Sequence, residues 1–426
     1  MRIAALFCIG VSVAALLYSG PSAAQALIQG QGVADRARPD YDQRGARFGS
    51  YVLFPSVTLT AEATNNYLAS NTNRRSDAYL VIAPELFVRG DFARTRVEGR
   101  AFATQALHAN LPGENVGQYG ASASGAFEPN RDWQLRTDVS AAHYVESRSS
   151  LGAFQDAREP VSYDVLHAGV GVTRRFVDLS VSANAALDDR NFGDASLRDR
   201  TPIDQDFRDV RLTTLGGTVQ YDLRNGIALI ANAQYDSEDY NDQTAAPGLI
   251  APGVIDPGLN RDSSGFNILG GVSLELTSLV FGTVQVGYLK RSYDDPQFRD
   301  FSGLSYNADL LWNVTPLTSA RFRASRSVQG TSSPFIAGNT RSDFRATVDH
   351  ELYRYVILTG DVGYGRFRPN GVGIGGDEYY AGARARYLID RRYSVSGGVR
   401  YSGRSSDSPF LRYNAAYADV SLRIAF

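Results

Sequence analysis

The chain has 426 residues, among them 43 basic and 45 acidic side chains, which give a formal net charge of −2 at pH 7. This balance leaves no excess of basic charge for a nucleic-acid partner, so we predict none. The only cysteine, Cys8, lies in a segment that we expect to be removed, which excludes disulfides and thiolate metal sites from the mature protein.

The first residues, 1–26, indicate a secretory signal peptide. Arg2 precedes an apolar run that ends at Tyr18, and the alanine-glutamine-alanine pattern at residues 24–26 is typical of a cleavage site. We expect the following segment, residues 27–48, to lie outside the sheet described next, either in the periplasm or inside a lumen.

Residues 49–426 repeat one unit, a segment of roughly ten to fifteen residues in which apolar and polar side chains alternate. A period of two sends successive side chains to opposite faces of a strand. We count about 18 such segments, with 16 as the alternative. No interior linker marks a domain boundary, and no later stretch is apolar enough for a membrane-spanning helix.

The connections between these segments alternate between tight turns and long polar loops. Tight turns include EPNRD, DLRNG and LIDRR, whereas the loops include SRSSLGAFQDAREP and NNYLASNTNRRSD. Short turns on one rim and long loops on the other are typical of a transmembrane β-barrel. We therefore predict an all-β fold over residues 49–426: a transmembrane antiparallel β-barrel in the bacterial outer membrane, with short periplasmic turns and long extracellular loops.

Charged side chains occupy one face of several predicted strands, as where Arg96, Glu98 and Arg100 alternate with Val97 and Gly99. Such a face needs water or mutual pairing, whereas lipid requires only a modestly apolar face. The charged faces are therefore candidates for the lumen, and two roles stay open: conduction of anions, or bracing of the wall by ion pairs with acids such as Glu85, Glu98, Asp343, Asp349 and Asp419. The lumen-lining candidates are Arg94, Arg96, Glu98, Arg100, Arg321, Arg323, Arg345, Arg384, Arg386, Arg400 and Arg423.

The chain ends on AAYADVSLRIAF, an alternating segment with Phe426 as its last residue. Val420, Leu422, Ile424 and Phe426 fall on one face. This ending resembles the terminal recognition signal of bacterial outer-membrane barrels, which implies the barrel assembly machinery as a partner.

Nothing in the sequence indicates an enzyme. The four histidines are far apart, and we find neither a nucleophile elbow nor a phosphate-cradling loop, so we predict no catalytic residue and no cofactor. The acid-rich stretches DSEDYND and DDRNFGD offer carboxylate oxygens for calcium, but their spacing does not fit an EF-hand. We expect solvated loop acids that face lipopolysaccharide, and we assign no metal site.

Residues 44–70, RGARFGSYVLFPSVTLTAEATNNYLAS, resemble the N-terminal motif of the putative β-barrel porin 2 family. The APEL stretch at residues 83–86 and the basic segment after it also match. The likeness extends over nearly all of the mature chain, but only these first fifty residues carry specific motifs. The matching positions are Arg44, Gly45, Arg47, Gly49, Ser50, Tyr51, Pro55, Asn65 and Asn66.

This resemblance implies passage of secreted exopolysaccharide or capsular polysaccharide, in concert with a periplasmic polysaccharide export protein. Two alternatives stay open: a general diffusion porin for small anionic or neutral solutes, and a plugged barrel whose loops act as an adhesin. In each case the expected surroundings are outer-membrane lipid and lipopolysaccharide.

Overall fold

The computed structural model describes residues 30–151, 153, 157–197, 200, 202–223, 226–241, 260–276, 279–330, 336, 338–370 and 373–426. The predicted signal peptide, residues 1–26, lies outside the described residues. Within the described part of the chain, no helix has both the length and the apolar character needed to cross a membrane.

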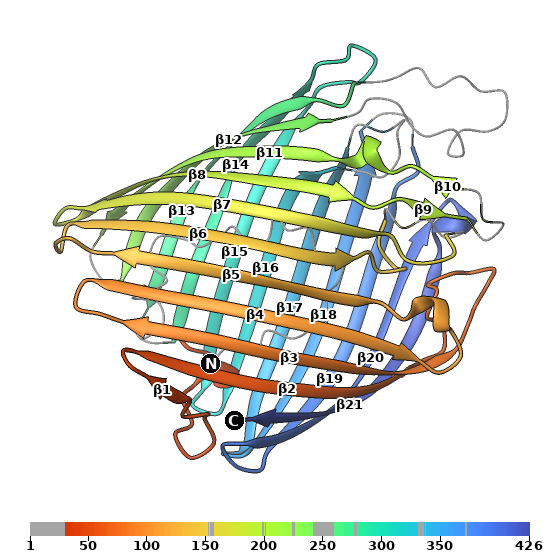
Figure 1. The fold of residues 1–426 in the computed structure, drawn as a ribbon. Coiled ribbons are helices and arrows are strands. Elements are labelled where there is room, and N and C mark those ends of the chain that lie inside the picture. Colours follow the sequence, from red (N-terminus) through yellow and green to blue (C-terminus); the bar gives the residue numbers. More distant parts are fainter. Residues whose placement is uncertain are drawn as a thin grey trace.

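Eighteen antiparallel strands form one closed wall (Figure 1). They are β2 (Tyr51–Thr64), β3 (Asp77–Asp91), β4 (Thr95–His108), β5 (Gly117–Phe127), β6 (Trp133–Val145), β7 (Ser162–Arg175), β8 (Leu179–Phe192), β11 (Val210–Asp222), β12 (Ile227–Tyr240), β13 (Ser263–Leu276), β14 (Val280–Tyr293), β15 (Phe301–Thr315), β16 (Thr318–Gln329), β17 (Asn339–Tyr353), β18 (Val356–Pro369), β19 (Gly376–Leu388), β20 (Tyr393–Ser406) and β21 (Tyr413–Ala425). The predicted fold class and strand number are confirmed.

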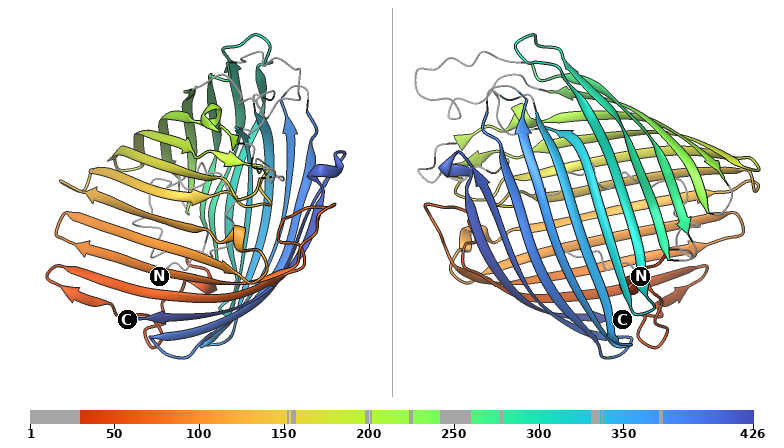
Figure 2. Two further views of the ribbon diagram at one scale, coloured as in Figure 1. Left: turned by 45° about the vertical axis from the view of Figure 1, so that its right-hand side comes forward. Right: turned by 180° about the vertical axis from the view of Figure 1, so that it is seen from behind.

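The wall closes where the last strand meets the first. β21 pairs with β2 from Ser56 opposite Ala425 to Thr64 opposite Tyr417. Every other wall strand pairs with its neighbours in the sequence, and β8 pairs directly with β11. The strands tilt steeply against the barrel axis, so that in Figures 1 and 2 the β2–β8 side crosses the opposite side at a large angle.

Short and long connections alternate around the barrel as predicted. The short turns, which include residues 92–94, 316–317 and 354–355, lie on one rim, and loops such as 65–76, 109–116 and 294–300 lie on the other. Because the number of strands is even, residue 30 and Phe426 both lie near the short-turn rim (Figures 1 and 2).

Several smaller elements are not part of the barrel wall. β1 (Ala46–Phe48) forms a tight hairpin with the start of β2, where Gly49 adopts a φ of +60°. This hairpin is the structure adopted by the RGARFGSY motif. The other elements are η2 (Val33–Asp35), η3 (Pro112–Glu114), η4 (Asp206–Arg208), η5 (Pro409–Leu411) and the pair β9 (Ala195–Ser196) and β10 (Pro202–Ile203).

The two faces of the wall differ as the alternation predicts. On β17, Phe344 and Val348 point outward with 38% and 46% of their surface exposed, whereas Arg345 and Asp349 point into the barrel. Outward tyrosines gather at the short-turn rim, where Tyr355 contacts both Tyr353 and Tyr387. Aromatic rings of this kind suit the boundary between lipid and water.

Two adjacent glycines on β13 provide a test of the wall. A methyl group at Gly271, on the inner face, would overlap the carbonyl oxygen of Val284, whereas Gly270 has open space on the outer face. We expect Gly271→Ala to destabilise the barrel by about 1–3 kcal/mol and Gly270→Ala to have little effect. The measurement is the temperature at which the folded, faster-migrating band disappears from SDS gels. Equal transition temperatures for the two variants would contradict the close β13–β14 approach.

Candidate functional site

Ion pairs between neighbouring strands cover much of the inner wall. In the β15–β16 register Asp309 stands opposite Arg323, and its carboxylate accepts hydrogen bonds from Arg321 at 2.7 Å and from Arg323 at 3.3 Å. Elsewhere on the inner wall, Arg100 of β4 lies 3.0 Å from Glu85 of β3. Residues opposite one another in a sheet share a face, so these contacts place both members of each pair in the lumen.

A third pair crosses a whole strand. Arg384 of β19 lies 2.7 Å from Asp419 of β21, and Gly398 of β20 stands between them in the register. A side chain at Gly398 would come within 3.1 Å of the Asp419 carboxylate. The glycine therefore leaves the space through which the guanidinium group reaches its partner.

The predicted lumen-lining residues fall at inward positions with one exception. Arg94 lies in the 92–94 turn, one residue before β4 begins, where its carbonyl oxygen accepts from the Glu128 amide. Its place at the lumen therefore stays a prediction, because the alternation of a strand does not assign a face to a turn residue. The residues at inward positions are Arg96, Glu98, Arg100, Arg321, Arg323, Arg345, Arg384, Arg386, Arg400 and Arg423. Their part in passage stays a prediction.

Several of the expected acid partners form ion pairs. Besides Glu85 and Asp419, Asp343 pairs with Arg341 at 2.8 Å. Asp349 instead accepts a hydrogen bond from the Thr359 hydroxyl at 2.6 Å. The basic residues of the lumen are thus in large part tied to the wall, which favours bracing as one of their roles.

Sequence reasoning missed a histidine bridge inside the barrel. His167 of β7 contacts Asp138 of β6 at 2.5 Å through Nε2 and Asp188 of β8 at 3.0 Å through Nδ1. Each strand contributes one member, and only the strand register brings them together. The alternation could have placed all three residues on the inner face. It could not have predicted the strand register that brings them to the same level along the barrel axis.

The described start of loop 146–161, residues 146–151, reaches across the mouth at the long-loop rim. The guanidinium group of Arg404, which points inward from β20, donates to the Ser149 carbonyl oxygen and pairs with Glu378 at 2.7 Å. Arg148 of the same loop pairs with Glu114 at 2.7 Å, with both side chains buried. The strands β21, β2, β3, β4 and β5 separate β6 from β20, so the loop spans part of the opening and narrows it.

A second loop, 65–76, packs against the inner side of β21. Ala69 lies in a small apolar cluster with Tyr413 and Ala415. The fully buried Asn66 donates to the Asn414 carbonyl oxygen, and Asn65 accepts from the Ala416 amide. These two asparagines of the N-terminal motif therefore fasten the loop to the last strand.

The segment 30–43 lies against the inner edge of the wall at the short-turn rim. The Val33 amide donates to the Ser319 hydroxyl at 2.8 Å, and Arg38 pairs with Glu351 at 2.7 Å. At its other end, the Gln43 amide group donates to the carbonyl oxygens of Pro55 and Phe426 at 2.8 and 3.0 Å. Gln43 thus joins β2 to β21 where the barrel closes.

Val420, Leu422 and Ile424 of the predicted assembly signal lie at the end of β21, and Phe426 directly follows the strand. Val420 and Phe426 are 60% and 66% exposed, and the Phe426 amide donates to the Pro55 carbonyl oxygen at 3.0 Å. Recognition of Val420, Leu422, Ile424 and Phe426 by assembly machinery stays a prediction.

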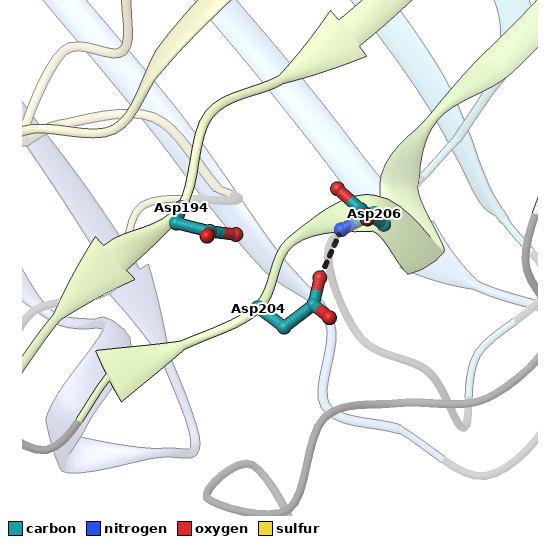
Figure 3. Close-up of side chains that lie close together, drawn as sticks. All are labelled: Asp194, Asp204 and Asp206. Atoms are coloured by element: carbon teal, nitrogen blue, oxygen red, sulfur yellow. Dashed lines mark hydrogen bonds between the residues drawn. The ribbon is translucent and has the colours of Figure 1, made fainter.

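Three exposed carboxylates gather in the connection between β8 and β11, where Asp194, Asp204 and Asp206 have oxygen atoms within 4.8 Å of one another (Figure 3). Asp204 also accepts from the Asp206 amide at 2.8 Å. Only Asp194 belongs to the acid-rich stretches noted in the sequence. Exposed acids often gather in this way without an ion, so the cluster defines no metal site by itself.

Asp209 closes the same connection. Its carboxylate accepts hydrogen bonds from the Asn191 side chain at 2.6 Å and the Phe192 amide at 2.7 Å. The pKa of Asp209 is raised to about 6, mainly by burial. The hydrogen bond from the Phe192 amide lowers this pKa, whereas neighbouring acids such as Asp206 raise it. A raised carboxyl pKa means that the folded connection loses stability as the pH rises from the ordinary value of 3.8 to about 6.

A closed wall of this kind, with charged side chains inside and apolar ones outside, defines a transmembrane barrel with a hydrophilic interior. The family model described as putative beta-barrel porin 2 matches residues 38–426. The chain belongs to this family and is an outer-membrane β-barrel protein. No curated protein matches.

Solved structures with similar folds are outer-membrane barrels at low sequence identity. The siderophore receptor PirA from Acinetobacter baumannii has a TM-score of 0.47 and 8% identity, over 92% of this chain and 81% of that one. A mutant of the ferric enterobactin receptor PfeA from Pseudomonas aeruginosa has a TM-score of 0.45 and 9% identity, over 90% and 81%. OpdK from Pseudomonas aeruginosa, solved with vanillate, has a TM-score of 0.43 and 11% identity, over 88% and 99%.

The contact between Arg404 and loop 146–161 predicts a change in conductance. Arg404→Ala removes the donor that holds the Ser149 carbonyl, so the loop should leave the β20 wall and single-channel conductance should rise. Arg366→Ala is the matched control, because Arg366 of β18 pairs with Asp377 of the neighbouring strand β19, at 2.8 Å, on the outer face. Planar bilayer recordings test this, and an unchanged conductance in Arg404→Ala would mean that the loop does not limit the current.

Proposed function

We propose that the barrel is a passive channel for hydrophilic solutes and favours anions over cations. The observation that carries the proposal is the sharing of Asp309 between Arg321 and Arg323, which leaves a net positive charge on this part of the inner wall. A pore lined by guanidinium groups concentrates anions and repels cations. The side chains bind and steer, and no covalent step is required of them.

A second function, export of a secreted polysaccharide, is favoured by a row of aromatic rings on the inner wall. Phe102, Tyr144, Tyr163 and Phe192 come from β4, β6, β7 and β8, and successive ring centroids are 6.2, 5.7 and 5.2 Å apart. The row runs from the middle of β4 to the long-loop rim. Flat rings with electron-rich faces can stack on the C–H faces of sugar rings.

The row is continuous because β5 contributes a glycine where it crosses. A Cβ atom at Gly120 would lie 2.7 Å from the Cβ of Ala142 and 2.9 Å from the Phe102 ring. Arginines lie over both ends, with Arg100 5.3 Å from the Phe102 centroid and Arg208 4.0 Å from the Phe192 centroid. A chain of sugar residues, acidic or neutral, suits such a surface, and the family resemblance adds a periplasmic export protein as its expected partner.

Ion selectivity tests the channel proposal. Wild-type barrel in a planar bilayer under a potassium chloride gradient should show a reversal potential on the anion-selective side. The combined variant Arg321→Ser and Arg323→Ser should shift the potential toward that of a cation-selective pore, because it leaves Asp309 uncompensated. Arg366→Ser on the outer face is the control and should match wild type. An electrically silent barrel would instead support the plugged, loop-binding alternative.

Secretion of surface polysaccharide tests the export function. A clean deletion strain should lose secreted polymer and accumulate it in the periplasm, and the wild-type gene should restore export. The variant Tyr144→Ala with Tyr163→Ala should restore it poorly at normal protein level. Phe344→Ala is the control, because Phe344 stacks between Tyr306 and Tyr364 in a similar row on the outer face. Unchanged polymer in the deletion strain would rule out export and leave the porin function.

A further inference from the structure

A small polar cavity lies between the segment 30–43 and the wall at the short-turn rim. The segment contributes Arg36, Arg38 and Asp42. The wall contributes side chains from β18, β19, the turn after β19, and the ends of β20 and β21. The arginines that line the cavity are Arg36, Arg38, Arg386, Arg391, Arg392 and Arg423, and its acids are Asp42 and Asp390.

The hydrogen bonds of these arginines hold the guanidinium groups in place without using all of their donors. Arg38 is buried, and its Nη2 donates to Glu351 and to the Val33 carbonyl oxygen, but its Nε has no partner in the described structure. Arg391 donates to the Pro39 carbonyl oxygen at 2.9 Å, and Arg423 donates to Gln43 at 3.2 Å. Each guanidinium group carries five N–H donors, so further donors remain for another acceptor.

Both acids that line the cavity already accept backbone hydrogen bonds. Asp42 accepts from the Arg38 backbone amide, and Asp390 accepts from the amides of Arg392 and Tyr393 at 2.7 and 2.8 Å. Of the acids behind the lining, Glu351 pairs with Arg38, and Asp349 accepts from Thr359. The lining therefore keeps more positive than negative charge, and its guanidinium groups repel one another across a small space.

We propose that this cavity binds an oxyanion, a carboxylate or phosphate group of a periplasmic solute, and that the bound anion fastens the segment 30–43 to the barrel wall. Guanidinium groups match the geometry of both kinds of oxyanion and bind them with charge-assisted hydrogen bonds. Arg36 and Arg38 come from the segment, whereas Arg386, Arg392 and Arg423 come from the wall and its turn. An anion held between the two sets adds attraction where repulsion now acts.

This inference goes beyond passage through the lumen and does not depend on which solute the barrel carries. On this proposal, the attachment of the segment 30–43 to the short-turn rim depends on a bound anion. With the anion bound, the segment stays against the inner edge of β15–β17, and without the anion its attachment depends on the contacts already described.

The test uses the full mature barrel in a non-ionic detergent, titrated with inorganic phosphate and with citrate at constant ionic strength. Calorimetry should show saturable binding, and trypsin cleavage after Arg36 should slow as either anion is added. The combined variant Arg386→Gln and Arg423→Gln should bind about tenfold more weakly or worse, because charge-assisted hydrogen bonds are lost. Arg366→Gln on the outer face should bind as wild type does.

A second variant guards against a folding defect in the first. Arg36→Gln lies outside the strands, so the barrel should keep its heat-modifiable band on SDS gels while its affinity for phosphate or citrate falls. The proposal is overturned if wild type binds neither anion, or if the wall and segment variants bind as tightly as wild type. It is also overturned if anions leave the rate of trypsin cleavage in the segment unchanged. Conductance is not used as a readout, so failure of the channel function would not affect the result.

Discussion

Every backbone amide and carbonyl group within the hydrocarbon layer must find its hydrogen-bond partner in the protein, because lipid offers none. The pairing of β21 with β2 meets this requirement by leaving no free edge in the wall. The alternation follows from the same constraint, since each strand must show one face to lipid and the other to the lumen. The Gln43 contacts with Pro55 and Phe426 strengthen the closure at the rim where β2 begins and β21 ends.

The charged side chains inside the barrel connect strands of the wall and also attract solutes. Arg384 reaches Asp419 across β20, and His167 joins β6 to β8, so side chains tie together strands that the backbone ladder does not connect directly. Such bridges need close approach, which Gly398 permits by having no side chain. Where two arginines share one acid, as at Asp309, one positive charge is not neutralised and can attract an anion in the lumen. Bracing and conduction are thus compatible in one set of residues.

The two mouths are restricted by different means. At the long-loop rim, Arg404 holds loop 146–161 across part of the opening, and Asn66 fastens loop 65–76 to β21. At the short-turn rim, the segment 30–43 lies along the inner edge through Val33, Arg38 and Gln43. The aromatic row begins in the middle of the wall and ends under the first of these rims, whereas the arginine-lined cavity belongs to the second.

The sequence by itself determined the barrel, its strand number, its sorted loops and the inward position of Arg321, Arg345 and Arg400, because a period of two assigns faces without any knowledge of neighbours. It also indicated the family through residues 44–70. It did not show that Arg94 lies in a turn, since alternation does not show where a strand begins. Only the tertiary structure decided that Asp138, His167 and Asp188 meet, that Ser149 reaches Arg404, and that Arg36 and Arg423 line one cavity. These contacts depend on strand register and on the paths of loops across an enclosed space, and neither leaves a periodic trace in the sequence.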